Sequence, residues 1–225
     1  LAEKGFRVLY YDAFGHGRSD RPAIRYRLDV FIRQLDQLTA KLGIDAMHLI
    51  GWSLGAAIST AFAAQHPGRV SSLTLISPAL FMSRSRMSQM LLRVPGSSAL
   101  VARRIGRIAD RVDFDLSRPE RFPDLAARVR EQMSFPGFQR AVASALVNFP
   151  RTPPRRWIAA GQHVRPVLVV WGDDDPVTPI AAAAQVLAVF PRATLRRIKG
   201  ARHAAHLDHA EIVHPAIIDH LNDCA

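Results

Sequence analysis

The stretch "LIGWSLGAA", residues 49–57, decides the fold of this chain. It joins an apolar run, Met47 to Gly51, to a run of small residues, Leu54 to Gln65. The first run predicts a buried strand and the second a helix that ends at His66-Pro67-Gly68. A strand that turns directly into a helix leaves little room around the residue at its tip. We therefore expect glycine to be required at both Gly51 and Gly55, with Ser53 exposed between them.

Ser53 is the candidate nucleophile. The helix that follows directs its N-terminus at the same point as the serine hydroxyl, and that end of a helix favours negative charge. The backbone N–H of Leu54 would donate to an oxyanion formed there. A chance match is the alternative in a protein with 13 glycines, but the strand before and the helix after Ser53 argue against it.

A serine hydroxyl needs a base, and the chain offers nine histidines. In a parallel sheet, reactive groups gather beyond the C-terminal ends of the strands. His203 directly follows an expected strand, Ala193 to Lys199, and is the predicted base, with His206 as the second choice. We expect structural or surface roles for His48, His66, His163, His214 and His220.

The acid that orients the base should follow another strand. The expected strand Val167 to Trp171 leads into three successive carboxylates, Asp173, Asp174 and Asp175, of which Asp175 is favoured. At least one of the three should be an ordinary solvated acid of the turn. The strand expected over Val70 to Ser77 is followed by no acid. The resulting order of serine, aspartate and histidine is one of the known orders of a catalytic triad.

Strands and helices alternate along both ends of the chain. We expect further elements as follows: a strand over Phe6–Asp12 and helices over Leu28–Leu42, Pro179–Phe190 and Ile212–Leu221. This alternation predicts an α/β fold, a mostly parallel sheet with helices on both faces. Residues 81–165, here called the middle segment, show helical patterns broken by proline and glycine. We expect it to be a helical cap inserted between two parts of the core, residues 1–80 and 166–225.

Positive charge is concentrated in the middle segment. Between Phe81 and Pro166 there are 16 Arg, no Lys and 6 acidic residues, a net charge of +10 out of +11 for the chain. A basic insertion on a neutral body argues against a nucleic-acid-binding protein. Residues 97–112 form a basic amphipathic pattern, which we interpret as a lid helix with a solvated arginine face. Weak peripheral contact with an anionic membrane is the alternative.

The cysteine content and the length of the apolar runs indicate the class of protein. Of cysteine there is only Cys224, next to the end of the sequence, so no intrachain disulfide can form, which fits a reducing, cytoplasmic compartment. No run of about 18 apolar residues exists to span a membrane. Nothing in the motifs implies a metal or an organic cofactor.

Four motifs together resemble the α/β-hydrolase superfamily. They are "DAFGHGRSDRP" (residues 12–22), "GWSLG" (51–55), "VLVVWGDDDPVTP" (167–179) and "IKGARHAAHLDHAEIV" (198–213). The resemblance implies a Ser53, Asp175 and His203 triad and a lid-bearing esterase, monoacylglycerol lipase or C–C bond hydrolase. Serine at position 53 argues against the epoxide hydrolase and dehalogenase branches. Ala56 replaces a frequent third glycine, and Ala204 stands where the C–C hydrolases usually carry tryptophan.

The expected reaction is hydrolysis of a small-molecule carboxylic ester, lipid-like or anionic in character. Cleavage of a C–C bond in a dienoate-type acid is the alternative, as is a non-catalytic binding protein on the same fold. By the resemblance, the family's first three strands and its second oxyanion donor, carried by a His-Gly loop, precede everything present here. His16-Gly17 belongs to a later loop and is not that donor. We therefore expect the sequence to be a piece of a longer protein.

Overall fold

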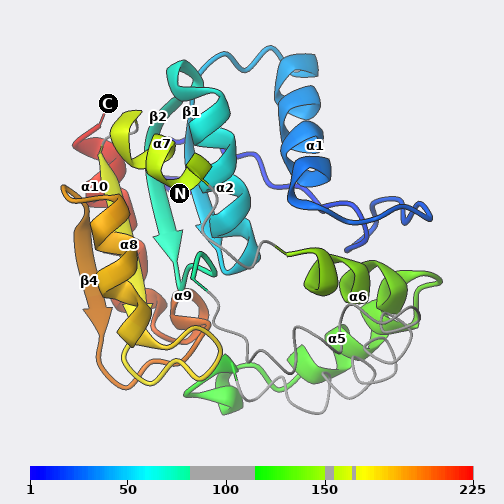
Figure 1. The fold of residues 1–225 in the computed structure, drawn as a ribbon. Coiled ribbons are helices and arrows are strands. Elements are labelled where there is room, and N and C mark those ends of the chain that lie inside the picture. Colours follow the sequence, from blue (N-terminus) through cyan, green and yellow to red (C-terminus); the bar gives the residue numbers. More distant parts are fainter. Residues whose placement is uncertain (82–114, 150–154, 164–165, 225) are drawn as a thin grey trace.

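The computed structural model describes residues 1–81, 115–149, 155–163 and 166–224. Its sheet has four parallel strands in the order β1 (Met47–Trp52), β2 (Val70–Ile76), β3 (Val167–Gly172) and β4 (Thr194–Ile198). Strands that run in the same direction need crossovers, and helices supply them here. The fold is the predicted one, an α/β sheet covered on both faces (Figure 1).

Two helices of the first part of the chain pack on each other, and the second of them packs on β1 and β2. They are α1 (Leu28–Lys41), with apolar residues at helical spacing, and α2 (Leu54–Gln65), which has the predicted bounds. The last part of the chain contains α8 (Ala183–Val189), the short α9 (Ala205–Asp208) and α10 (Ala210–Asn222). Along the chain, three helices come after β2 and before β3: α5 (Leu125–Ser134), α6 (Phe138–Asn148) and α7 (Arg155–His163). Short 3-10 turns cover Ala2–Lys4, Pro67–Arg69, Pro119–Arg121 and Ile180–Ala182.

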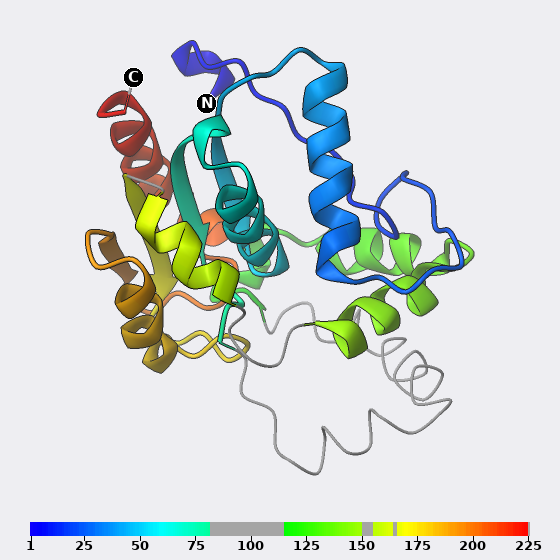
Figure 2. The same cartoon turned by 45° about the horizontal axis from the view of Figure 1, so that its top comes forward.

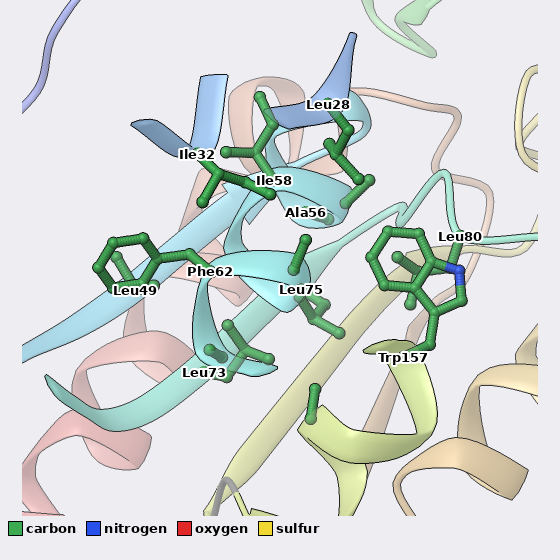
Figure 3. Close-up of a cluster of buried hydrophobic side chains, with 14 of the residues drawn as sticks. Leu28, Ile32, Leu49, Ala56, Ile58, Phe62, Leu73, Leu75, Leu80 and Trp157 are labelled. Carbon is green, nitrogen blue, oxygen red and sulfur yellow. The ribbon is translucent and has the colours of Figure 1, made fainter. Parts of the chain in front are cut away.

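Side chains of β3 divide the core between two layers, because successive residues of a strand point to opposite faces. Val167, Val169 and Trp171 join the larger cluster, which contains residues of α1, α2, α7 and α8. Leu168 and Val170 join the smaller cluster under α9 and α10. Figure 3 shows the larger cluster around Phe62 of α2 and Trp157 of α7.

The prediction of a strand over Phe6–Asp12 is wrong. These residues form no ladder, and Val8, Leu9 and Tyr10 are exposed. A strand exists only when a neighbour accepts and donates its hydrogen bonds, and no described strand lies beside this run. The β1 strand is accordingly an edge of the described sheet, with Ile50 partly exposed.

Residues 115–149 lie to one side of the sheet, against the loop that follows Asp12 (Figure 2). Arg140 of α6 donates to the carbonyls of Arg21 and Pro22, and Ser144 Oγ accepts from Tyr26 N. The basic pattern of residues 97–112 is outside the described residues. Within the described ranges, no helix is long and apolar enough to cross a membrane.

Candidate active site

Ser53 occupies a strained turn between β1 and α2. Its φ of 53° and ψ of −115° are rare for any residue with a side chain and cost about 1–3 kcal/mol. The neighbouring backbone holds this conformation. Ser53 N donates to Ile76 O at 3.0 Å, and Ser53 O accepts from Ala56 N and from Ala79 N. The turn therefore presents Ser53 at the C-terminal ends of β1 and β2.

The glycines on either side of Ser53 have different roles. A Cβ at Gly51 would lie 2.5 Å from Gly55 O and 2.6 Å from Ala56 N, so only glycine fits there. A Cβ at Gly55 would meet no described atom within 4 Å. The expectation that both positions need glycine is therefore right for Gly51 and wrong for Gly55 in the described structure. The reason is that the tight approach is made by the backbone of α2 onto residue 51.

His203 and Asp175 meet in a buried site. His203 Nδ1 lies 2.9 Å from Asp175 Oδ2, and their side chains are 4% and 0% exposed. Asp175 Oδ1 accepts from the backbone N–H groups of Val177 and Thr178, both at 2.8 Å. Burial by itself would raise the pKa of Asp175, but His203 and the Thr178 donors outweigh it and lower that pKa below its ordinary value. Asp175 is thus held as a carboxylate facing the imidazole.

The other two carboxylates of the same loop face elsewhere. Asp173 accepts from Arg197 Nε at 2.8 Å, and Asp174 is exposed. His206, the second choice as base, has no carboxylate partner among the described residues. Burial lowers its pKa to about 4, helped by the charges of His214 and His203. Of the candidate acids and bases, Asp175 and His203 are the pair that the described structure brings into contact.

Two residues of this site were missed by the sequence analysis. The Thr178 hydroxyl lies 2.8 Å from Asp175 Oδ2 and 3.3 Å from His203 Nδ1. Trp52 donates its indole N–H to His203 O at 2.9 Å and packs its ring against His203. The spacing Asp-Pro-Val-Thr is typical of an aspartate that bonds the backbone two and three residues on, so Thr178 had a local signal. Trp52 had none, because 151 residues separate it from His203.

Ser53 directly follows Trp52, whose indole N–H reaches His203 O, so the chain brings the serine to the side of this pair. Within the described part of the chain, no hydrogen bond joins Ser53 Oγ to His203. Such contacts are often long in an enzyme without substrate and tighten in the reacting complex. Leu54 begins α2, so its N–H has no partner within the helix and is available to an oxyanion. Ser53, Leu54, Asp175 and His203 are therefore all at the same end of the sheet.

The five histidines for which structural or surface roles were expected lie outside this constellation. His48 Nδ1 is 2.8 Å from Ser72 Oγ, His66 is 3.9 Å from Asp36, and His214 bonds His206 O. His163 ends α7, and His220 lies on α10. A cavity of about 490 Å³ is lined by residues of α5, α6 and their connection, and contains none of the candidate catalytic residues. Among the described residues, no group of three or more His, Cys, Asp and Glu could hold a metal ion.

Comparison with known proteins gives the family. The family described as the alpha/beta hydrolase fold matches residues 1–210, and this chain belongs to it. The 2-hydroxy-6-oxononadienedioate/2-hydroxy-6-oxononatrienedioate hydrolase of Paraburkholderia xenovorans is 28% identical over 238 residues, which cover 98% of this chain and 78% of that protein.

Solved structures agree on the fold. A thermophilic esterase from Thermogutta terrifontis has a TM-score of 0.76 at 22% identity, over 95% of this chain and 78% of its own. A bromoperoxidase from Bacillus anthracis has a TM-score of 0.81 at 19% identity, over 99% and 84%. These comparisons support a hydrolase. They do not decide which bond is cleaved, because the same fold serves esterases, C–C hydrolases and a bromoperoxidase.

Proposed function

We propose that this chain is a serine hydrolase that cleaves carboxylic esters with Ser53, His203 and Asp175. The observation that carries the proposal is the buried contact of 2.9 Å between His203 Nδ1 and Asp175 Oδ2, at the end of the sheet where the strained turn presents Ser53. A histidine whose Nδ1–H is bound by a carboxylate keeps Nε2 free as a base. This arrangement activates a serine and requires no metal.

The reaction proceeds in two halves. Ser53 Oγ attacks the ester carbonyl while His203 Nε2 takes the hydroxyl proton of the serine. The oxyanion that forms accepts a hydrogen bond from the backbone N–H of Leu54. His203 then returns the proton to the departing alcohol, leaving an ester on Ser53. Water then attacks the acyl-enzyme while His203 takes its proton, and His203 gives that proton to Ser53 Oγ as the bond to the acyl group breaks and the carboxylic acid leaves. Asp175 stabilises the imidazolium that forms in both halves.

A neutral substrate suits the electrostatics of the site. Asp115 contributes a second carboxyl group there, close enough for the charges of both His203 and Asp175 to act on it. Burial raises the pKa of Asp115, the charge of Asp175 raises it further, and His203 opposes the shift. An anionic substrate would approach two carboxyl groups that already repel each other, so an uncharged ester is favoured.

The second candidate is hydrolysis of a C–C bond in a dienoate-type acid. It is favoured by the relative of Paraburkholderia xenovorans, which is named for that chemistry. Against it stands Ala204, where those enzymes usually carry tryptophan. Ala204 is 1% exposed, and its N–H donates to Asp115 O at 2.8 Å, so the space beside the base is closed by the backbone of the middle segment.

A fluorophosphonate probe tests the proposal. We expect stoichiometric labelling of the wild-type chain on Ser53 and none in Ser53→Ala, while Ser71→Ala, an exposed serine on β2, labels normally. A series of p-nitrophenyl esters of rising chain length and a 2-hydroxy-6-oxo-dienoate, assayed side by side, then identify the bond cleaved. Turnover of the dienoate alone would contradict the ester proposal. Absence of labelling would contradict a serine hydrolase and favour a non-catalytic binding protein with this fold.

A further inference from the structure

Asp208 is a further buried carboxylate near the base, and among the described residues the hydrogen bonds that its carboxylate accepts come from the middle segment. The residue is 0% exposed. Its Oδ2 accepts three hydrogen bonds, from Ser117 N at 2.5 Å, Ser117 Oγ at 2.7 Å and Arg118 N at 3.0 Å. A carboxylate removed from water is stabilised by such donors, so we expect this contact to form as a unit.

Two arginines extend the contact around the end of α9. Arg118 and Arg121 donate to the backbone oxygen of Asp208 at 3.3 and 2.7 Å, and both reach the Glu211 carboxylate of α10 at 2.8 and 3.3 Å. The Ser117 hydroxyl also lies 2.9 Å from His209 Nε2. We call these residues, Ser117, Arg118, Arg121, Asp208 and Glu211, the Asp208 clamp. Figure 1 shows the short turn of Pro119–Arg121 close to α9.

The clamp lies at one end of the stretch that carries His203. At the other end of this stretch, Ala204 N donates to Asp115 O at 2.8 Å. Residues 203–208 are therefore bound at both ends by residues 115–118. On the core side, Trp52 holds the His203 carbonyl and Asp175 holds its ring. The position of His203 thus depends on two parts of the chain at once.

We infer that Asp208 is a positioning residue that couples the middle segment to the base: its clamp fixes residues 203–208 so that the His203 imidazole stays aligned with Ser53. The inference rests on the proposed function, because it assigns no reacting atom to Asp208. Alignment of reacting groups within a few tenths of an ångström is worth large rate factors, so a loosened clamp should slow turnover without weakening substrate binding.

The test compares Asp208→Asn, Ser117→Ala and the double variant in ester hydrolysis, with active sites counted by fluorophosphonate titration. We expect kcat per titrated site to fall roughly tenfold in Asp208→Asn and less in Ser117→Ala, with KM unchanged within about twofold. The double variant should lose no more than Asp208→Asn alone, because both changes break one contact. Asp36→Asn is the matched control, since Asp36 accepts from Arg69 at 2.6 Å on the far part of the core. It should lower Tm and leave kcat per site unchanged.

Three outcomes would overturn the inference. They are an unchanged kcat per site in Asp208→Asn, losses that multiply in the double variant, or a loss of kcat in Asp36→Asn as large as in Asp208→Asn. If Asp208→Asn does not fold, Ser117→Ala alone decides, and a kcat per site equal to the wild type overturns the inference. A wild-type chain that neither labels nor hydrolyses esters refutes the proposed function itself, which keeps the two failures distinct.

Discussion

Two buried carboxylates fix the stretch that carries His203, and they are built from different parts of the chain. Asp175 takes donors from Val177 and Thr178 in its own loop and then faces His203. Asp208 takes its donors from Ser117 and Arg118, about 90 residues earlier. The first carboxylate is set by local geometry and acts on the imidazole directly. The second exists only when the middle segment has packed, and acts through the backbone.

The largest expected effect is on the carboxylate that contacts the His203 imidazole directly. Asp175→Asn should lower kcat by roughly 10⁴-fold, the scale seen when the acid of a serine protease triad is replaced by its amide. An amide that presents an N–H to Nδ1 favours the wrong tautomer of His203. Asp173→Asn in the same loop is the control, and its kcat should stay near the wild type. Equal losses in the two variants would show that the loop, and not the charge facing His203, matters.

The Thr178 hydroxyl gives an intermediate effect. Thr178→Val keeps the volume and the backbone N–H bond to Asp175 but removes the hydroxyl that lies between the carboxylate and the imidazole. We expect kcat to fall about tenfold with KM unchanged, and Thr178→Ser to restore most of the rate. A Thr178→Ser variant as slow as Thr178→Val would contradict the prediction that the hydroxyl alone sustains the rate.

These effects also show what sequence reasoning could reach. The turn at Ser53 and the bounds of α2 follow from residues close together in the chain. The pairing of Asp175 with His203, 28 residues apart, follows from their places directly after two expected strands. Thr178 belongs to the same local pattern and could have been found. The clamp could not, because nothing near Asp208 indicates that Ser117 will deliver two donors to it. The strand expected over Phe6–Asp12 failed for the same reason: apolar composition predicts a strand, but pairing needs a neighbour elsewhere.

His206 lies two residues before Asp208 and is expected to make this stretch sensitive to acid. Its folded pKa of about 4 is below the unfolded value of 6.5 chiefly because folding removes much of the water around the ring. The unfolded chain therefore binds a proton first, and stability should fall as the pH drops from about 6.5 to about 4. Thermal melts over this range should show a smaller decline for His206→Asn than for the wild type. The exposed His163→Asn should decline like the wild type, and identical declines in all three would refute the assignment.

The smallest effect is expected at the rim of the clamp. The side chains of Arg118, Arg121 and Glu211 are 41–48% exposed, and ion pairs that water screens in this way contribute little to stability. Arg118→Gln with Arg121→Gln should therefore change kcat by less than about twofold and lower Tm slightly, less so at high salt. A loss of kcat as large as that of Asp208→Asn would show that the arginines, and not the buried carboxylate, couple the middle segment to the base.

The most direct measurement of the central claim is the mass of the acyl-enzyme. Rapid acid quenching of the wild-type chain with a p-nitrophenyl ester should trap one acyl group, and peptide mapping should place it on Ser53. Asp175→Asn should accumulate the same adduct far more slowly, and Ser53→Ala should form none. An acyl group on another residue, or ester turnover that persists in Ser53→Ala, would contradict the account.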